Sequence, residues 1–372
     1  MKRKDIYVLG IMSGTSLDGL DFSLIKTDAK QKITFIHEKY FMFEPKLREE
    51  IKQVIFFFQN NNYNIAYKSH LYQSFNLKFS EYLLKKINFF LDLFSFKKSN
   101  LNILGLHGNT LIHNPKKGIS LQLGDAKFLS KKIGKPVVVN FRNKDISMGG
   151  QGAPLVPIFH KAIFSKKKKK IMIVNIGGIS NFTYLIGKKK MYASDIGPGN
   201  SLIDKFCKKK FNKNYDNYGF LAAKGEIRHD VVNKWIKSIS FKRRFPKSFD
   251  IMEFNIEDYI LRDKTSDFDN LRSLTYLSAK LISNLEHRFN NKIDQWIFCG
   301  GGVYNKTLTS DLGKLLQEKD FFLSDELGFN SLFIESAAFA YISARTFFNL
   351  PSAFPETTGC KKKNVCGDII MP

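Results

Sequence analysis

Short apolar runs and polar turns alternate along the first part of the chain. Residues 6–12, 20–26 and 33–43 are apolar runs separated by polar or glycine-containing turns, which predicts three β-strands in an antiparallel meander. Residues 47–58 and 65–93 then carry apolar side chains three and four positions apart, with charged side chains between them, which predicts two helices. The remaining elements predicted for this first α/β unit are strands at 101–106 and 136–140, the return strand of a hairpin at 118–124 and a helix at 126–133.

The second part of the chain begins with the same pattern. A continuous apolar strand is predicted at residues 171–176, a turn of glycine and hydroxyl residues follows, and another strand leaves this turn at 182–186. The first strand of the chain enters a similar turn, as expected if two similar domains face one nucleotide. The other elements predicted here are a strand at 295–299 and helices at 201–211, 230–239, 271–289, 306–316 and 331–348.

These patterns predict an α/β protein of two domains. A chain of 372 residues is too long for one ordinary hydrophobic core. We assign residues 1–160 to an N-terminal α/β domain and residues 161–372 to a C-terminal α/β domain, with a hinge near 150–170. The cleft between the two domains is the expected ligand site.

The chain is strongly basic, with a formal net charge of +25. Nearly all of the excess is lysine, spread in runs such as 166–170, 188–190, 208–210 and 361–363, whereas specific readers of nucleic acid usually favour arginine. We therefore interpret the charge as a drift in composition, with no nucleic-acid partner. The positive charge is also compatible with a general attraction to anionic metabolites.

The cysteines and the apolar segments indicate a cytoplasmic protein. Cys207, Cys299, Cys360 and Cys366 have neither zinc-finger nor CxxC spacing, so reduced thiols are the simplest interpretation. The first apolar run is too short for a signal peptide, and charged residues interrupt the longest later one. We expect no membrane partner.

The turn after the first strand is a candidate phosphate-binding loop, which we call the first loop. Its glycines allow close approach of a polyphosphate, its hydroxyls and N–H groups can bind phosphate oxygens, and Asp18 could hold Mg²⁺ through water. The alternative is a simple hairpin turn, since serine, glycine and aspartate are common turn residues. The candidate nucleotide-binding residues of the first loop are Gly14, Thr15, Ser16, Leu17, Asp18, Gly19, Leu20 and Asp21.

Two further glycine turns follow predicted strands. Gly177 and Gly178 could form a second phosphate clamp, and the triplet Gly300, Gly301 and Gly302 could let an adenosine lie against the backbone. Neither turn matches a Walker A motif or the GxGxxG dinucleotide fingerprint. One glycine triplet is weak evidence, but three strand-turn sites in one chain together favour nucleotide binding.

Asp195 is the candidate general base, because it ends a strand just before a Gly-Pro-Gly turn that leads into a helix. Its alternative role is to cap that helix or turn. Asp145 and Gln151 belong to a glycine-rich stretch that either closes on a polar ligand or is a surface loop. Glu335 lies on a largely apolar helix, where a buried carboxylate must be paired, either in a structural network or with a ligand.

Nine strings of residues occur together in a characteristic order between residues 10 and 341. The chain resembles anhydro-N-acetylmuramic acid kinases in the order and approximate spacing of these strings. The resemblance implies a two-domain actin/hexokinase-like (ribonuclease H-like) fold, and ATP with Mg²⁺ as cofactors. It also implies conversion of 1,6-anhydro-N-acetylmuramic acid to N-acetylmuramic acid 6-phosphate in cell-wall recycling. The strings are GIMSGTSLDGLD, LGLHGNTLIHNP, LQLGD, NFRNKDISMGGQGAPLVP, VNIGGISNFT, SDIGPGNSLID, YDNYGFLAAKG, FCGGGVYN and IESAAFAY.

Carried over by position, the first loop resembles the ATP-phosphate loop, Asp195 the catalytic base, and Glu335 and residues 142–151 the lining of the sugar site. The family loop after Arg142 is usually richer in arginine, whereas this chain has Asn143 and Lys144, and lysine keeps the charge but loses the planar fork. The alternatives are a kinase of another sugar or polyol hydroxyl, and an ATP-driven binding protein of the same superfold. The expected partner is the small sugar, and the sequence leaves open whether the chain forms a homodimer.

Overall fold

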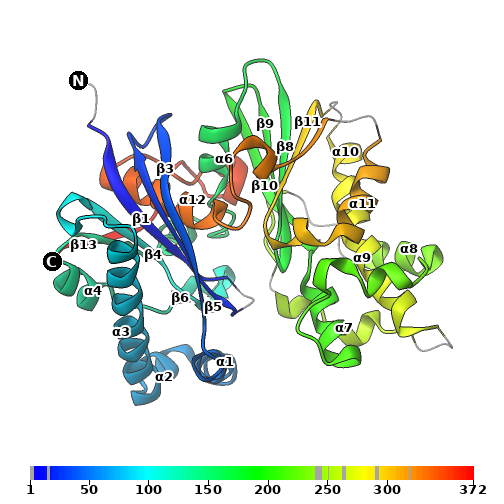
Figure 1. The fold of residues 1–372 in the computed structure, drawn as a ribbon, viewed down its shortest axis with the longest axis horizontal. Helices are drawn as coiled ribbons and strands as arrows, with labels where there is room; N and C mark the ends of the chain where they lie inside the picture. Colours follow the sequence, from blue (N-terminus) through cyan, green and yellow to red (C-terminus); the bar gives the residue numbers. More distant parts are fainter. Residues whose placement is uncertain are drawn as a thin grey trace. The chain divides into compact units, whose positions relative to one another are not determined.

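The computed structural model describes residues 4–14, 17–238, 245–249, 251–261, 265–289, 293–317 and 320–372. The chain forms two compact units (Figure 1). Unit 1 consists of Met1–Ile163 together with Glu335–Pro372, and unit 2 is Phe164–Ile334. Each unit contains its own sheet and its own apolar core, so each is described by itself.

The main sheet of unit 1 has the strand order β13-β7-β4-β1-β2-β3. Strands β1, β2 and β3 form an antiparallel meander, β1, β4 and β7 run parallel, and β13 is antiparallel to β7. The bounds are β1 Ile6–Met12, β2 Gly19–Thr27, β3 Ile33–Met42, β4 Ile103–His107, β7 Val137–Val139 and β13 Asp368–Ile370. A separate hairpin joins β5 (Thr110–Asn114) and β6 (Ile119–Gln122).

The helices of unit 1 pack through apolar side chains: α1 buries one face, whereas most residues of α12 are buried. Helix α1 buries Leu47, Ile51, Val54 and Phe58, which recur every three to four residues. The predicted helix at 65–93 is divided at Ser69, whose hydroxyl accepts the Tyr72 N–H and so begins a new helix. The helices are α1 Pro45–Asn60, α2 Tyr63–Lys68, α3 His70–Leu93, α4 Ala126–Ile133, α5 Asn143–Ser147, α6 Pro157–Phe164, α12 Ile334–Phe347 and α13 Pro355–Thr358.

The C-terminal segment belongs to unit 1, which differs from the predicted domain range of 161–372. Helix α12 contacts strand β1 closely, because a Cβ atom on Gly10 would lie 2.1 Å from the carbonyl oxygen of Ser336. The hydroxyls of Ser23 and Ser336 are 2.6 Å apart. Strand β13 pairs with β7 and completes the edge of the sheet. Backbone pairing and helix packing thus return the end of the chain to the first unit.

The sheet of unit 2 has the order β10-β9-β8-β11-β12, again with three antiparallel strands followed by parallel ones. The strands are β8 Lys170–Ile176, β9 Ile179–Ile186, β10 Lys190–Pro198, β11 Gln295–Cys299 and β12 Asp320–Leu323. The helices are α7 Ser201–Phe211, α8 His229–Ser238, α9 Asp267–Ser283, α10 Leu285–Arg288 and α11 Lys306–Leu315. This repeated strand order confirms the predicted ribonuclease H-like α/β fold.

In unit 2 the pattern of apolar and polar residues predicted the bounds of some elements correctly and of others incorrectly. Strand β11 and helix α7 have the predicted bounds. The predicted helix at 271–289 is two helices, α9 and α10, which meet at Asn284. The predicted helix at 230–239 is α8, and its last predicted residue, Ile239, lies outside the described residues. Of the residues that the structure describes, none belongs to a helix long and apolar enough to cross a membrane.

Candidate active-site residues of the two units

The first loop of unit 1 joins strands β1 and β2 and is tied to its surroundings by hydrogen bonds. The Ser13 hydroxyl donates to the Gly19 carbonyl at 2.7 Å, and the Asn109 side-chain amide donates to the Gly14 carbonyl at 3.3 Å. Leu17 has a positive φ of 56°, a conformation that costs energy in a residue with a side chain. The predicted phosphate-binding residues Thr15 and Ser16 lie outside the described residues. The described residues of the loop are thus tied by hydrogen bonds, and Leu17 is strained.

Three carboxylates of unit 1 influence one another beside this loop. Burial, together with the negative charges of Glu335 and Asp18, raises the pKa of Asp21 from its ordinary 3.8 to about 8. Asp21 lies on β2 and Glu335 in the first turn of α12. Glu335, which we expected in the lining of the sugar site, therefore lies within electrostatic reach of the first loop.

The residues around the first loop are compatible with Mg²⁺ bound chiefly through a nucleotide. In the described parts of the chain, no three His, Cys, Asp or Glu side chains form a group that could hold a metal by themselves. Mg²⁺ commonly uses one or two carboxylates together with waters and substrate phosphates. The repulsion among Asp18, Asp21 and Glu335 is the kind of electrostatic strain that a nearby cation relieves. Asp18 can supply one oxygen ligand of such an ion.

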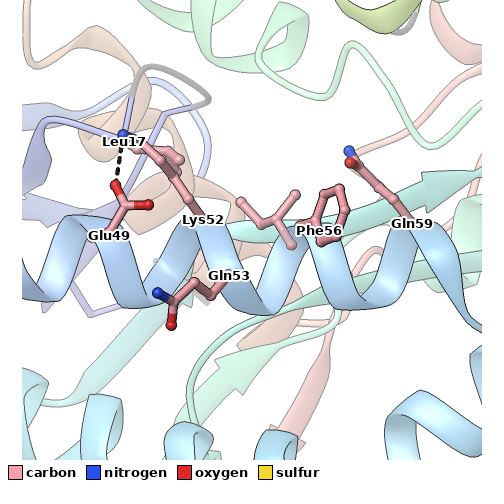
Figure 2. Close-up of a pocket in the computed structure, with 7 residues that line it drawn as sticks. Leu17, Glu49, Lys52, Gln53, Phe56 and Gln59 are labelled. Carbon is pink, nitrogen blue, oxygen red and sulfur yellow. Dashed lines mark hydrogen bonds and ion pairs between the residues drawn. The ribbon is translucent and has the colours of Figure 1, made fainter.

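A pocket of about 450 Å³ lies where the first loop meets helix α1 (Figure 2). Figure 2 shows Leu17 of the loop beside Glu49 and Lys52, with Phe56 and Gln59 farther along the helix. Leu17 is the only predicted site residue among its lining residues. The pocket therefore belongs to the edge of the candidate nucleotide loop and contains none of the predicted sugar residues.

Arg142 is held in unit 1 by a neutral histidine. Its Nε–H donates to Nε2 of His107 at 2.9 Å, and its Nη1 donates to the Gly152 carbonyl at 2.8 Å. Burial lowers the pKa of His107 far below its ordinary value, and the Arg142 charge lowers it further. His107 is therefore uncharged and presents the lone pair that the guanidinium requires.

Asp145 is wholly buried, and protein donors occupy its carboxylate. Oδ2 accepts the Gly152 N–H at 2.8 Å, while Oδ1 accepts the Thr358 hydroxyl at 2.7 Å and the Asn364 amide at 3.3 Å. The Gln151 N–H donates to the Thr358 carbonyl at 2.8 Å. The structure thus brings Arg142, Asp145 and Gln151 into one loop, and it anchors this loop to the C-terminal segment.

The cysteines of the C-terminal segment lie near the same carboxylate. Burial raises the pKa of Cys360, and it raises the pKa of Cys366 as well, with the Asp145 charge acting in the same direction. Both thiols are buried and reduced. Protonated thiols are poor nucleophiles, so these cysteines have no catalytic character.

Asp195 of unit 2 lies at a β-bulge near the end of strand β10, where the register with β9 shifts between Asp195 and Gly197. Its Oδ2 accepts the Phe249 N–H at 2.9 Å, and its own N–H donates to the Lys247 carbonyl at 3.0 Å. The side chain is only 8% exposed. The N-cap of the following helix α7 is Asn200, so Asp195 does not cap that helix.

The glycine turns of unit 2 meet at one end of its sheet. The N–H groups of Gly199 and Asn200 donate to the carbonyls of Gly178 and Gly177 at 2.9 and 2.8 Å. Gly300 has a φ of 85°, and a Cβ atom there would lie 2.2 Å from Oδ1 of Asn175, so this approach requires glycine. The structure therefore places the turn after Asp195, the turn at Gly177 and Gly178, and the glycine triplet side by side.

Sequence reasoning gave no role to several residues that shape these sites. His107 and Asn109 stand in the string LGLHGNTLIHNP, but their hydrogen bonds to Arg142 and to the first loop are between residues far apart in sequence. Thr358 and the backbone at Phe249 were missed for the same reason. The only feature of the sequence that could have pointed to such residues is a polar residue beside a glycine turn.

The repeated ribonuclease H-like units, with glycine turns at strand ends, place the protein in the actin/hexokinase-like class. The sequence model of the family described as anhydro-N-acetylmuramic acid kinase matches residues 6–372, and the chain belongs to this family.

Proteins named anhydro-N-acetylmuramic acid kinase are similar over nearly their whole length. The protein of Gamma-proteobacterium EBAC31A08 is 33% identical, with 98% of each chain covered. The protein of Pelagibacter ubique (strain HTCC1062) is also 33% identical, with 97% of each covered. Among solved structures, component A of Acidaminococcus fermentans (R)-2-hydroxyglutaryl-CoA dehydratase is a distant likeness, with a TM-score of 0.43 and 12% identity over 91% of this chain and 99% of that chain.

Proposed function

We propose that this protein is an ATP-dependent kinase that hydrolytically opens 1,6-anhydro-N-acetylmuramic acid and phosphorylates O6, giving N-acetylmuramic acid 6-phosphate. The observation that carries the proposal is membership of the family over residues 6–372, nearly the whole chain. A product of this kind belongs to the recycling of cell-wall sugars. The need for ATP favours action in the cytoplasm.

In the proposed reaction Asp195 is the general base. Its carboxylate takes a proton from a water molecule whose oxygen attacks C1 of the sugar, and the C1–O6 bond breaks. O6 then attacks the γ-phosphorus of ATP, and ADP leaves. The second hydrogen of the water stays on the new C1 hydroxyl. The Phe249 N–H, which donates to Oδ2 of Asp195, fixes the direction of the carboxylate.

The nucleotide is proposed to bind through the first loop, the turn at Gly177 and Gly178, and the glycine triplet at 300–302. Backbone N–H groups of such turns stabilise negative charge that develops on the transferring phosphoryl group. When bound, Mg²⁺ would neutralise part of this charge, held by Asp18 and phosphate oxygens. Gly301 suits contact with an adenosine, because among the described residues no atom beyond its chain neighbours lies within 4 Å of a Cβ atom built on it.

The sugar is proposed to bind through Arg142, Gln151 and Glu335. The lactyl group of the sugar carries a carboxylate, and the fixed guanidinium of Arg142 is a suitable partner for it. His107 holds the Arg142 guanidinium through Nε. A ligand would therefore be contacted by the outer nitrogens of Arg142, Nη1 and Nη2, and Nη1 also donates to the Gly152 carbonyl.

An assay of ADP release tests the proposed function. The purified protein is offered ATP, Mg²⁺ and one of four acceptors: the anhydro sugar, glucose, N-acetylglucosamine or glycerol. We expect sugar-dependent ADP release with the anhydro sugar alone. Turnover on glucose or glycerol without turnover on the anhydro sugar would instead support a kinase of another hydroxyl. ATP hydrolysis that ignores every sugar would support an ATP-driven binding protein.

A further inference from the structure

The loop at residues 142–152 is fixed to the rest of unit 1 through the C-terminal segment. Its carboxylate Asp145 is wholly buried, although the loop is short and rich in glycine. A buried carboxylate is costly unless donors satisfy it, so the groups that bond to Asp145 determine whether the loop keeps its shape. Thr358 is one of these groups and belongs to α13, about 210 residues away in sequence.

Thr358 holds the loop at two points. Its Oγ1 donates to Oδ1 of Asp145 at 2.7 Å, and its carbonyl accepts the Gln151 N–H at 2.8 Å. On its other oxygen, Asp145 accepts the Gly152 N–H at 2.8 Å. Residues 151 and 152 are therefore clamped between one threonine and one carboxylate.

The same clamp reaches Arg142. The Gly152 N–H is bonded to Asp145, and the Gly152 carbonyl accepts from Nη1 of Arg142 at 2.8 Å. A Cβ atom on Gly150 would lie 2.2 Å from Oδ2 of Asp145, so the loop closes tightly around this carboxylate. Movement of Asp145 therefore displaces both Gln151 and the guanidinium of Arg142.

We propose that Thr358 is a positioning residue for sugar binding, which keeps Arg142 and Gln151 in a preformed arrangement through Asp145. This inference rests on the proposed function. It also gives Asp145 an indirect role in place of the direct sugar contact expected from sequence. A preformed site does not lose binding energy to ordering of the loop, so loss of the clamp should weaken sugar binding more than the chemical step.

The neighbouring threonine provides a matched control. Thr357 and Thr358 are both buried in α13, but the Thr357 hydroxyl donates to the Phe354 carbonyl at 3.0 Å and makes no bond to the loop. Replacing either threonine by valine removes one buried hydroxyl and keeps the shape. The substitution Thr358→Ser keeps the hydroxyl that reaches Asp145.

The test compares Thr358→Val, Thr358→Ser and Thr357→Val with the unsubstituted protein. A hydrogen bond to a charged group is usually worth a factor of about ten or more in an equilibrium. We expect Thr358→Val to raise KM for the anhydro sugar about tenfold, with KM for ATP unchanged and kcat changed less. Thr358→Ser and Thr357→Val should both keep the KM of the unsubstituted protein. Calorimetric titration with the sugar, without ATP, should show the same order of affinities.

Two results would overturn the inference. One is a Thr358→Val protein with an unchanged KM for the sugar. The other is an equal fall in kcat for Thr357→Val and Thr358→Val, because equal falls would indicate that both variants simply contain less folded enzyme. If the unsubstituted protein does not phosphorylate the anhydro sugar at all, the proposed function is wrong. That result is distinguishable from an error in the role of Thr358, which would appear only in the variants.

Discussion

Asp21 stabilises the folded protein less than a neutral residue of the same shape would. Its pKa is raised to about 8 by burial and by the charges of Glu335 and Asp18, whereas the unfolded chain has the ordinary value of 3.8. A carboxyl with a raised folded pKa favours the folded state fully only below pH 4, and this contribution is lost as the pH rises toward 8. We therefore predict that Asp21→Asn increases the free energy of unfolding at neutral pH.

The size of the effect follows from the two pKa values. The interval from 3.8 to pH 7, at 1.36 kcal/mol for each pH unit, corresponds to about 4 kcal/mol. Because Asp21 is not fully buried, solvent screening reduces this figure, and we expect a gain of ~2–4 kcal/mol. The difference between variant and unsubstituted protein should be close to zero at pH 4 and largest above pH 8.

Asp28→Asn is a matched control of opposite sign in the same unit. Burial alone would raise the pKa of Asp28, but hydrogen bonds from the N–H groups of Lys30, Lys32 and Gln31 lower it overall. A carboxylate with a lowered pKa stabilises the fold above its unfolded pKa, and this stability is lost as the pH falls. We expect Asp28→Asn to lower stability slightly at pH 7.

Urea unfolding followed by circular dichroism, from pH 4 to pH 9 and without divalent cations, measures both variants. The two tryptophans, Trp235 and Trp296, lie in unit 2, so their fluorescence would not follow unit 1. An Asp21→Asn protein that is less stable at pH 7, or equally stable at every pH, would refute the electrostatic reasoning.

The remaining predictions concern the reaction and the charge. Asp195→Asn keeps the shape and an oxygen for the Phe249 N–H, so nucleotide binding should persist while turnover falls by ~10²-fold or more; near-normal turnover would exclude Asp195 as the base. In ¹⁸O-labelled water the label should appear at C1 of the product, and label in the phosphate would show a different order of bond breaking. Asp18→Asn should raise the Mg²⁺ concentration needed for half-maximal activity, measured by titration at fixed ATP. Gel-shift titration at ~150 mM salt should show no sequence-selective binding of nucleic acid, and a tight selective complex would contradict the interpretation of the +25 charge.

Local pattern was sufficient for most elements. The pattern of apolar runs and turns predicted strand β1 and helices α4 and α7 with the observed bounds. Such bounds are readable because side-chain spacing and turn residues act over a few positions. The division of the helix at 65–93 was not predicted, although Ser69 is a common capping residue, because the apolar pattern continues through it.

The sequence by itself determined the glycine turns, the order of the motifs and the class of chemistry, since these depend on residue type and spacing along the chain. Only the tertiary structure decided which distant residues meet. It joined residues 335–372 to unit 1, brought the charge of Glu335 to Asp21, and placed the hydroxyl of Thr358 against the buried carboxylate of Asp145. These contacts depend on strand pairing and helix packing between segments more than 200 residues apart, and no local pattern records such pairings.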